Sequence, residues 1–366
     1  MGVFKVFFEV NLQLPKPRDA PVTLWPAVQG TTTDMKKCGV IILNWNGVDL
    51  LRRFLPEAAR CTIDSDTDLI VADNGSTDDS LQWVAENHPD VLTIDLGENH
   101  GFARGYNLAI GQVDYPFVVL LNSDVKVTPG WVRPMRGFME KTPSAGACQP
   151  KIRWLKHPAL FEYAGAAGGL IDRNGYPYCR GRVMGSLEED RGQYDSPGKP
   201  VPVAWASGAA MMVRTALYRE LGGLDELFFA HMEEIDLCCR MARHGYGVYA
   251  VTDSTVYHVG GASLGKENPR KTYLNFRNNL LLLHKNMPPR QGRRLLFRRR
   301  LLDTLAWARF VALFKWRHAA AILRAHNDFR HLRRRYTDMP DTDFLHSLPG
   351  ADRNILLDHY LRRKTQ

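Results

Sequence analysis

Short runs of apolar residues recur along the first part of the chain, and each run ends in polar residues. Runs of this length, bounded by turn residues, are typical of strands buried on both faces of a parallel sheet. Helices are expected between them, from Val48 to about Cys61, through Glu86, and after the glycine-rich turn at 99–107. Strands that alternate with helices predict an α/β fold with a mostly parallel sheet and right-handed crossovers. The expected strands cover residues 39–44, 68–73, 91–96 and 117–121.

The polar residues at the strand ends are the first candidates for a ligand site. In open α/β sheets, ligands lie beyond the carboxyl ends of the strands. Asn122, Ser123 and Asp124 directly follow the run 117–121. A carboxylate among small polar residues is well placed to hold a hard divalent cation on phosphate groups. The alternative is that Asp124 only caps a turn.

The pattern changes at about Ala145, where the apolar runs shorten and glycines crowd the chain. This region predicts loops and β-hairpins that shape a substrate pocket. A strand entered through small residues is expected at 204–214, and a last strand at 247–251. Between them, helical spacing covers residues 233–244, with Gly245 as the C-cap.

Three carboxylates open that helix. Glu233, Glu234 and Asp236 lie where the helix dipole favours the ionised form that a general base requires. The alternative is structural, with the acidic cluster capping the helix and pairing with Arg240 or Arg243. Asp236 and Arg240 are spaced i,i+4, which favours a structural pair for Asp236.

Composition restricts the class of protein. The 366 residues suit one large domain or two small ones, and 45% hydrophobic with 24% charged residues indicate a globular chain. The six cysteines form no C-x-x-C pair, which argues against zinc and fits a reducing cytosol. The glycine-rich turn lacks the G-x-G-x-x-G fingerprint of a dinucleotide-dependent dehydrogenase. Since no uncharged apolar run reaches about 18 residues, no transmembrane helix is expected.

Three regions are expected along the chain. Residues 1–35 contain four prolines without a sustained period and predict a loose N-terminal extension, and Met35 is a candidate for the natural start. Residues 36–284 form the α/β domain. Residues 285–366 form a basic, amphipathic helical region.

The positive charge is concentrated in that last region. The net charge is +9, and the segment 290–335 alone has fourteen basic residues against Asp303 and Asp328. Trp307, Trp316 and many apolar residues interleave with the arginines, which favours helices lying at an anionic membrane surface. The alternative is a packing or oligomerisation segment with a solvated basic face. No nucleic-acid-binding module accompanies the charge, so no nucleic-acid partner is expected.

Taken together, the motifs resemble family 2 glycosyltransferases with the GT-A fold, and in particular the bacterial rhamnosyltransferase-like branch. The resemblance covers roughly residues 38–284, in the family's order. The motifs are Ile-Leu-Asn44-Trp-Asn46, Asp73-Asn-Gly-Ser-Thr-Asp78, Asn99-x-Gly-Phe-Ala-x-Gly-x-Asn107, Leu-Asn122-Ser-Asp124, Ser207-Gly208-Ala, Gly-Gly-Leu-Asp225-Glu, Phe-Phe-Ala-His-Met-Glu233-Glu234-Ile-Asp236-Leu and Tyr257-His258-x-Gly-Gly.

The resemblance implies a nucleotide-sugar donor and a divalent cation, Mg2+ or Mn2+. Asp124 is the remaining acid of the family's D-x-D motif, and it would bind the cation on the diphosphate together with His258. A neutral imidazole suits Mn2+ better than Mg2+, although His258 can also be a structural histidine. Trp205, Ser207 and Gly208 would shape the sugar or acceptor pocket. The residues implied near the nucleotide are Asn44, Asn46, Asp73, Asn74, Gly75, Arg104, Asn107, Asn122 and Ser123.

The resemblance also implies which carboxylate is the base. Family members carry Glu-Asp-x-Asp with the base in the second position, which is Glu234 here. Because Glu is one methylene longer than Asp, Glu233 and Asp236 stay open as alternatives. A single displacement assisted by one base inverts the anomeric carbon. A cation that bridges two phosphate oxygens neutralises the leaving group.

These residues predict an inverting, metal-dependent glycosyltransferase that uses a UDP- or dTDP-sugar, with rhamnose the leading sugar. The acceptor would be a saccharide or a polyprenyl-linked molecule, at the cytoplasmic face of a bacterial membrane, in cell-surface polysaccharide synthesis. Homo-oligomerisation stays open. One alternative is a nucleotidyltransferase, although the segment after Leu43 lacks the glycine-rich loop and lysine that it needs. The other is a membrane-docked sugar-binding or scaffold protein with a degenerate site.

Overall fold

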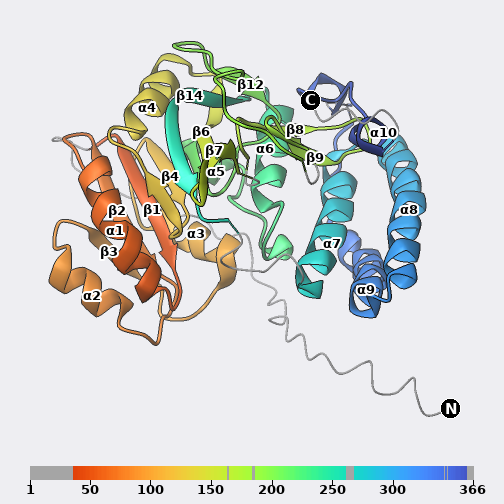
Figure 1. Ribbon diagram of the computed structural model, residues 1–366, viewed down its shortest axis with the longest axis horizontal. Coiled ribbons are helices and arrows are strands. Elements are labelled where there is room, and N and C mark those ends of the chain that lie inside the picture. Colours follow the sequence, from red (N-terminus) through yellow and green to blue (C-terminus); the bar gives the residue numbers. More distant parts are fainter. Residues whose placement is uncertain are drawn as a thin grey trace.

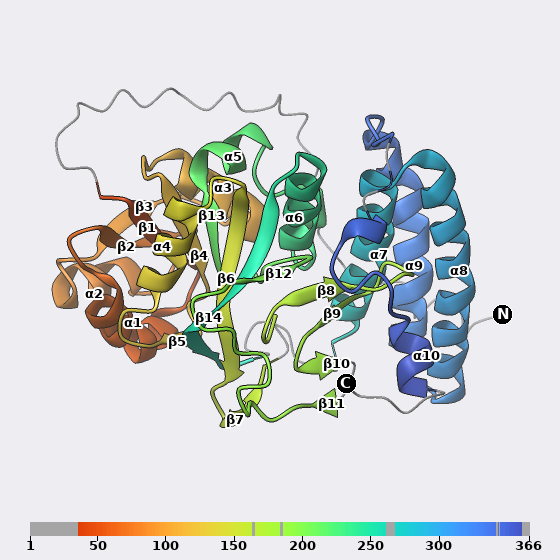
Figure 2. The same cartoon turned by 90° about the horizontal axis from the view of Figure 1, so that it is seen from above.

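The computed structural model describes residues 36–162, 165–183, 186–260, 268–341, 343 and 345–360. The expected N-terminal extension, residues 1–35, lies outside the described residues, and so does Gly261 of the last motif. A large sheet stands at the centre with helices on both faces, and the C-terminal helices pack together at one side (Figure 1 and Figure 2).

The central sheet has ten strands in the order β12-β14-β6-β13-β4-β1-β2-β3, with β5 paired to β14 and β7 paired to β6. β1 runs parallel to β2 and β4, β2 to β3, and β6 to β14, whereas β13 runs antiparallel between β4 and β6. The mostly parallel α/β sheet expected from the sequence is confirmed. The strands are β1 (Cys38–Asn44), β2 (Thr67–Asp73), β3 (Leu92–Asp95), β4 (Phe117–Leu121), β5 (Val125–Val127), β6 (Ala145–Trp154), β7 (His157–Phe161), β12 (Val201–Val203), β13 (Ala210–Arg214) and β14 (Gly247–His258).

Successive strand residues point into two separate cores, because side chains alternate between the faces of a sheet. In β1, Val40 and Ile42 pack with Leu51 of α1, whereas Ile41 packs in the cluster that contains Tyr106 of α3. Both faces of β1 are therefore buried, which explains its uninterrupted apolar run. The helices on the two faces are α1 (Val48–Thr62), α2 (Ser80–Asn87), α3 (Gly101–Gly111), α4 (Val132–Lys141), α5 (Thr215–Glu220) and α6 (Glu233–Arg243).

The glycine-rich region forms a second, four-stranded sheet in the order β11-β10-β9-β8. It lies between the central sheet and the C-terminal helices (Figure 2). A Cβ on Gly169 would collide with the ring of Trp205, so the close approach of this strand needs glycine. The strands are β8 (Gly169–Ile171), β9 (Pro177–Cys179), β10 (Arg182–Val183) and β11 (Ser186–Leu187).

The C-terminal helices are part of the same body. Leu280 to Leu283 of α7 belong to the main hydrophobic core, and the expected domain boundary after residue 284 falls inside α7. None of the helices in the described part of the chain has the length and hydrophobicity that crossing a membrane requires. The helices are α7 (Pro269–Asn286), α8 (Pro289–Ala312), α9 (Trp316–Leu332) and α10 (Ile355–Tyr360), and the short 3-10 turns are η1 (Glu226–Phe228), η2 (Arg333–Arg335) and η3 (Leu345–Ser347).

The last strand is longer than the sequence pattern predicts. β14 continues past Val251 to His258, with a register shift between Val251 and Thr255. The polar residues 252–254 interrupt the apolar alternation at this irregularity, so the pattern alone ends the strand too early.

Candidate active site

Asp124, His258 and Glu162 meet beyond the end of β4. His258 Nε2 lies 3.0 Å from Asp124 Oδ1, and His258 Nδ1 lies 3.2 Å from Glu162 Oε2. β5 pairs with β14 and sets Val125 opposite His258, which brings Asp124 to the imidazole. All three side chains are buried. The structure thus brings together the two expected metal ligands and adds a carboxylate behind the histidine.

The two carboxylates control the protonation of His258. Burial alone would lower the pKa of His258, but the hydrogen bonds and charges of Asp124 and Glu162 raise it to about 10. The imidazole therefore holds its proton between the two carboxylates at neutral pH. A metal ion at Nε2 has to replace that proton, since ligating histidines are neutral.

The side chains of Asp124 and His258 fit a divalent cation that is also bound by a diphosphate. No three His, Cys, Asp or Glu side chains in the described ranges converge as a complete metal site. Asp124 and His258 offer one carboxylate and one imidazole, to which phosphate oxygens can add. Glu162 contacts the far nitrogen of the imidazole, an arrangement that orients metal-binding histidines.

Asp73 organises the turn at the end of β2. Its carboxylate accepts hydrogen bonds from Asn44 Nδ2 at 3.0 Å, from the Ser76 N–H at 2.7 Å and from the Ser76 hydroxyl at 2.6 Å. Asn46 accepts a hydrogen bond from the Thr77 N–H at 2.7 Å, which ties the ends of β1 and β2 together. Asp73 is itself buried, so it shapes this turn while Asn46 remains exposed on its surface.

Asn74 and Gly75 connect the same turn to the start of α3. The Asn74 amide donates to the Asn99 side chain at 3.2 Å and to the Gly101 carbonyl at 3.1 Å. Gly75 has φ +71°, and a Cβ on it would lie 2.5 Å from the Glu98 backbone. Glycine is therefore required both by the left-handed conformation and by the approach of the neighbouring loop.

The two residues of α3 expected near a nucleotide differ in their surroundings. Arg104 is partly exposed, and its guanidinium lies 3.7 Å from Glu226 Oε2. Asn107 is buried, and its amide donates to the Leu224 carbonyl at 2.8 Å and accepts from the Tyr218 hydroxyl at 2.6 Å. Because these polar atoms are used inside the protein, Asn107 fixes the turn before η1 in place of the expected nucleotide contact.

Glu233 and Glu234 are the first two residues of α6, and each has a buried carboxylate oxygen that lacks a hydrogen-bond partner among the described residues. Burial raises the pKa of both, and that of Glu234 to about 7. Oε2 of each is buried and has no hydrogen-bond partner within the described part of the chain. Glu233 is buried as a whole, whereas Glu234 keeps some accessible surface. Of these two glutamates, Glu234 is the one that keeps exposed surface, although its Oε2 is buried.

Both carboxylate oxygens of Asp236 accept hydrogen bonds from other side chains of the protein. Asp236, the third candidate for the base, therefore does not fit that role. Its Oδ2 accepts from Arg240 Nε and from Lys285 Nζ, both at 2.8 Å, and its Oδ1 accepts from Asn286 Nδ2 at 2.8 Å. Burial alone would raise the pKa of Asp236, but the charges of Arg240 and Lys285 lower it. The i,i+4 pair expected from the spacing forms.

The backbone just before α6 adopts an unusual conformation. Phe229, His231 and Met232 have φ values of 64°, 69° and 74°. Non-glycine residues seldom adopt this region, and such residues cluster at functional sites. His231 Nε2 is buried without a hydrogen-bond partner among the described residues, and burial lowers the pKa of His231 to about 4.

Ser207 and Gly208 lie on a loop that contacts both the turn after β4 and the start of α6. The Ser207 N–H donates to Gln149 Oε1 at 2.9 Å, and the Asn122 N–H donates to the Ala209 carbonyl at 3.0 Å. A Cβ on Gly208 would lie 3.7 Å from Glu234 Cβ. One side of this loop therefore touches the half-buried turn of Asn122 and Ser123, and the other side touches the base candidate.

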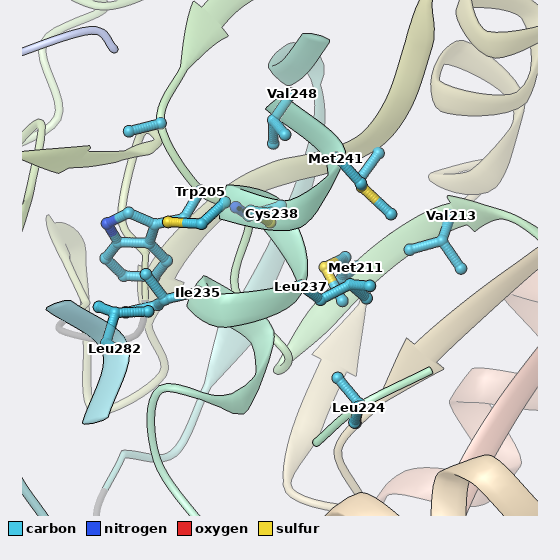
Figure 3. Packing of buried hydrophobic residues seen from close by; sticks show 14 of the residues in the cluster. Trp205, Met211, Val213, Leu224, Ile235, Leu237, Cys238, Met241, Val248 and Leu282 are labelled. Carbon is cyan, nitrogen blue, oxygen red and sulfur yellow. Dashed lines mark hydrogen bonds between the residues drawn. The ribbon is translucent and has the colours of Figure 1, made fainter. Parts of the chain in front are cut away.

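Trp205, the remaining residue expected in the acceptor pocket, lies in the core. Its indole N–H donates to the Leu170 carbonyl at 2.9 Å, and its ring lies beside Ile235 and Leu282 (Figure 3). Its side chain is almost entirely buried. The Trp205 ring packs beside Ile235 of α6 and offers no open face to a sugar, because apolar side chains cover it.

Sequence reasoning missed several residues of the site. Glu162 follows β7 without a recognisable motif around it, and only the structure brings it to His258. Ser76 lies inside a quoted motif and could have been found as a turn residue that binds Asp73. Arg277 and Asn278 stand among other polar residues of α7, so the sequence around them did not mark them, and only the structure shows that both are buried.

The chain is similar in sequence to proteins of known function. Residues 39–195 match the family model described as glycosyl transferase family 2. The N-acetylglucosaminyl-diphospho-decaprenol L-rhamnosyltransferase of Mycobacterium tuberculosis (strain ATCC 25618 / H37Rv) is 27% identical over 243 residues, which cover 62% of this chain and 78% of that protein. The low-salt glycan biosynthesis hexosyltransferase Agl10 of Haloferax volcanii is 26% identical over 265 residues, which cover 69% and 77%.

Solved structures agree with the fold. TarS 1–349 of S. aureus in complex with UDP-GlcNAc matches with a TM-score of 0.53 at 16% identity, over 80% of each chain. GalNAc-T7 with UDP, GalNAc and Mn2+ also gives a TM-score of 0.53, at 12% identity, and the match covers 69% of this chain and 48% of that one. At these identities the likeness confirms the GT-A fold. Neither the nucleotidyltransferase nor the scaffold alternative finds support in these matches.

Proposed function

We propose that this glycosyltransferase, whose residues 39–195 match the family 2 model, inverts the anomeric carbon of a metal-bound UDP- or dTDP-sugar. The acceptor is a saccharide or a polyprenyl-linked molecule in cell-surface polysaccharide synthesis. The Mycobacterium tuberculosis relative is named as a rhamnosyltransferase for a decaprenol-linked sugar. That name supports rhamnose as the leading sugar and a polyprenyl diphosphate as the leading acceptor carrier.

The observation that carries the proposal is the environment of the Glu234 carboxylate. Burial raises its pKa to about 7, and its Oε2 has no partner among the described residues. A base with a pKa near the working pH combines a useful ionised fraction with a strong tendency to take a proton. Glu234 also borders Gly208 at the sheet edge that carries Asp124. These features support Glu234 as the base that accepts the proton of the acceptor hydroxyl.

The cation and the donor occupy the other part of this edge in the proposal. Asp124 and His258 would hold the cation, which neutralises the charge on the leaving diphosphate. Glu162 keeps the imidazole of His258 oriented. Arg104 is a partly exposed cation in the first turn of α3, and the Gly101 carbonyl of that turn accepts a hydrogen bond from Asn74. Arg104 would bind the donor's phosphate or ribose.

We also propose that α8 rests on an anionic membrane. Phe297, Leu301 and Leu305 follow one another on successive turns and are 56–68% exposed. Phe314 and Trp316, which follow the end of α8, are also exposed, whereas Trp307, expected to take part, is only partly exposed. Apolar side chains framed by cations suit an interface of acidic lipid headgroups. The exposed flanking arginines are Arg290, Arg293, Arg294, Arg298, Arg300 and Arg317.

A direct transfer assay tests the enzymatic proposal. Purified protein is incubated with dTDP-rhamnose or UDP-GlcNAc, a polyprenyl-diphosphate-linked saccharide and Mn2+, and the product anomer is determined by NMR. Wild type and the control Glu220→Gln, at an exposed site on α5, should form one inverted product. Glu234→Gln should form almost none. A retained anomer, or full activity of Glu234→Gln, would refute the proposed mechanism.

A further inference from the structure

α7 reaches from the C-terminal helices to the segment that leads into α6. We call this segment, Leu227–Met232, the α6 entry segment. The guanidinium of Arg277 donates to the carbonyl of Leu227 at 3.0 Å and to that of Phe228 at 2.8 Å. Arg277 is one of the largest fully buried side chains of the protein. Its charge is therefore held by backbone carbonyls of a segment that lies far away in the sequence.

Asn278 extends this contact along the same segment. Its amide nitrogen lies 2.9 Å from the carbonyl oxygens of Phe228 and Ala230, and 2.7 Å from that of His231. Its own oxygen accepts a hydrogen bond from Arg277 Nε at 2.8 Å, so the orientation of the amide is fixed. Asn278 is completely buried. No water can replace these bonds without opening the core.

The α6 entry segment needs such support. Phe229, His231 and Met232 all have positive φ, and a backbone of this kind persists only where the surroundings hold it. Met232 is also the N-cap of α6. Glu233 and Glu234 follow directly, so any movement of the segment moves both carboxylates.

α7 grips α6 a second time, roughly two helical turns later. Lys285 Nζ lies 2.8 Å from Asp236 Oδ2 and 2.7 Å from Asp225 Oδ2, and Asn286 Nδ2 lies 2.8 Å from Asp236 Oδ1. The first turn of α6 is thus held before Glu233 and again after Glu234. Both anchors come from one helix, which Figure 2 shows beside α6.

We propose that α7 is a positioning element of the active site, in which Arg277 and Asn278 fix the α6 entry segment and thereby the direction of Glu234. Neither residue touches a reactant in this proposal. It rests on the proposed role of Glu234 as the base. α7 is then a structural part of catalysis, whereas α8 provides the proposed surface for lipid.

Asn279 provides a matched control. It follows Asn278 on α7, is equally buried, and donates to the Gly175 carbonyl at 2.9 Å, away from the α6 entry segment. Asn278→Asp should lower kcat at least tenfold, leave the KM for the nucleotide-sugar unchanged, and speed amide hydrogen exchange in residues 227–234. Asn279→Asp should lower the melting temperature but leave kcat and that exchange unchanged.

If Asn278→Asp does not fold, Asn278→Ala removes the donors without adding a charge, and the same pattern is expected. Equal loss of kcat in the Asn278 and Asn279 variants would overturn the proposal, and so would unchanged exchange in residues 227–234. Amide exchange needs no substrate. An active Glu234→Gln variant would therefore refute the base, while the exchange experiment still tests the anchoring.

Discussion

Glu234 and Asp236 lie two residues apart at the start of α6, and their surroundings shift their pKa values in opposite directions. Burial raises the pKa of Glu234 to about 7, whereas Arg240 and Lys285 lower that of Asp236 despite its burial. Pairs of carboxylates with separated pKa values mark a division of roles. Here Glu234 is suited to take a proton, and Asp236 is suited to remain a permanent anion that binds α7.

The first prediction concerns pH and activity. If Glu234 is the base, kcat/KM should rise about tenfold per pH unit below pH 7 and level off above it, because only the ionised form accepts a proton. Glu234→Gln should lose about 10²- to 10⁴-fold in kcat and lose this dependence. Steady-state kinetics between pH 5 and 9 measure both. A pH profile that stays the same in Glu234→Gln would contradict the assignment.

The same group predicts a stability effect of defined sign. The folded pKa of Glu234, about 7, lies above its ordinary value of 4.5. Its contribution to stability is thus complete below that ordinary value and is lost as the pH rises through about 7. Glu234→Gln should therefore melt at a higher temperature than wild type at pH 8. At pH 4 the two melting temperatures should converge, and differential scanning calorimetry at both values measures this.

A third prediction concerns Glu162 and the metal. Because Glu162 contacts His258 Nδ1, Glu162→Gln should weaken Mn2+ binding in the presence of UDP by about 10- to 100-fold. Asp124→Asn should abolish Mn2+ binding within the measured range. Isothermal titration calorimetry provides the constants. Glu189→Gln, at an exposed glutamate paired with Arg191, is the control and should bind Mn2+ as wild type does.

Two glycines separate conformational strain from steric conflict. Gly75 and Gly97 have similar φ values of 71° and 78°, but only at Gly75 does an added Cβ meet the backbone of Glu98. Gly97→Ala should cost about 1 kcal/mol of unfolding free energy, and Gly75→Ala clearly more. Urea unfolding measures the difference. Gly75→Ala should also weaken nucleotide binding, and equal stability losses would show that the turn adapts.

The membrane proposal predicts binding to anionic vesicles. The triple variant Phe297→Gln, Leu301→Gln, Leu305→Gln should sediment less with phosphatidylglycerol vesicles than wild type, while transfer to a short soluble acceptor is unchanged. Leu92→Gln, at an exposed leucine on edge strand β3, is the control. High salt should weaken binding of wild type, because screening acts on the arginines. If wild type is a dimer and the triple variant is a monomer, this surface instead serves self-association.

Much of the fold follows from local sequence. The strands β1, β2 and β4 are predicted well because each is a dry apolar run that ends in polar residues. Helix α6 is predicted from its spacing and from Gly245, which has φ +81°. β14 is not, because its polar interruption at 252–254 breaks the alternation while the backbone continues its pairing.

The site is predicted only in part, since its remaining contacts join distant segments. The family resemblance assigns Asp124 and His258 to one site, but nothing local assigns Glu162, 96 residues before His258. Trp205 and Asn107 are motif-associated residues whose polar atoms turn out to serve the core. A sequence pattern cannot separate these cases, because the direction of a side chain depends on what packs around it.

The grip of α7 on α6 limits how this protein can be recombined with its relatives. A chimera that exchanges the segment 145–203, to change sugar preference, leaves both partners of the Lys285–Asp236 bond in the same parent. A crossover between residues 245 and 268 separates them and mismatches Arg277 and Asn278 with the carbonyls that they bind. Functional crossovers should therefore fall before Asp225 or after Asn286. In such chimeras, α6 and α7 have to be transferred together from one parent.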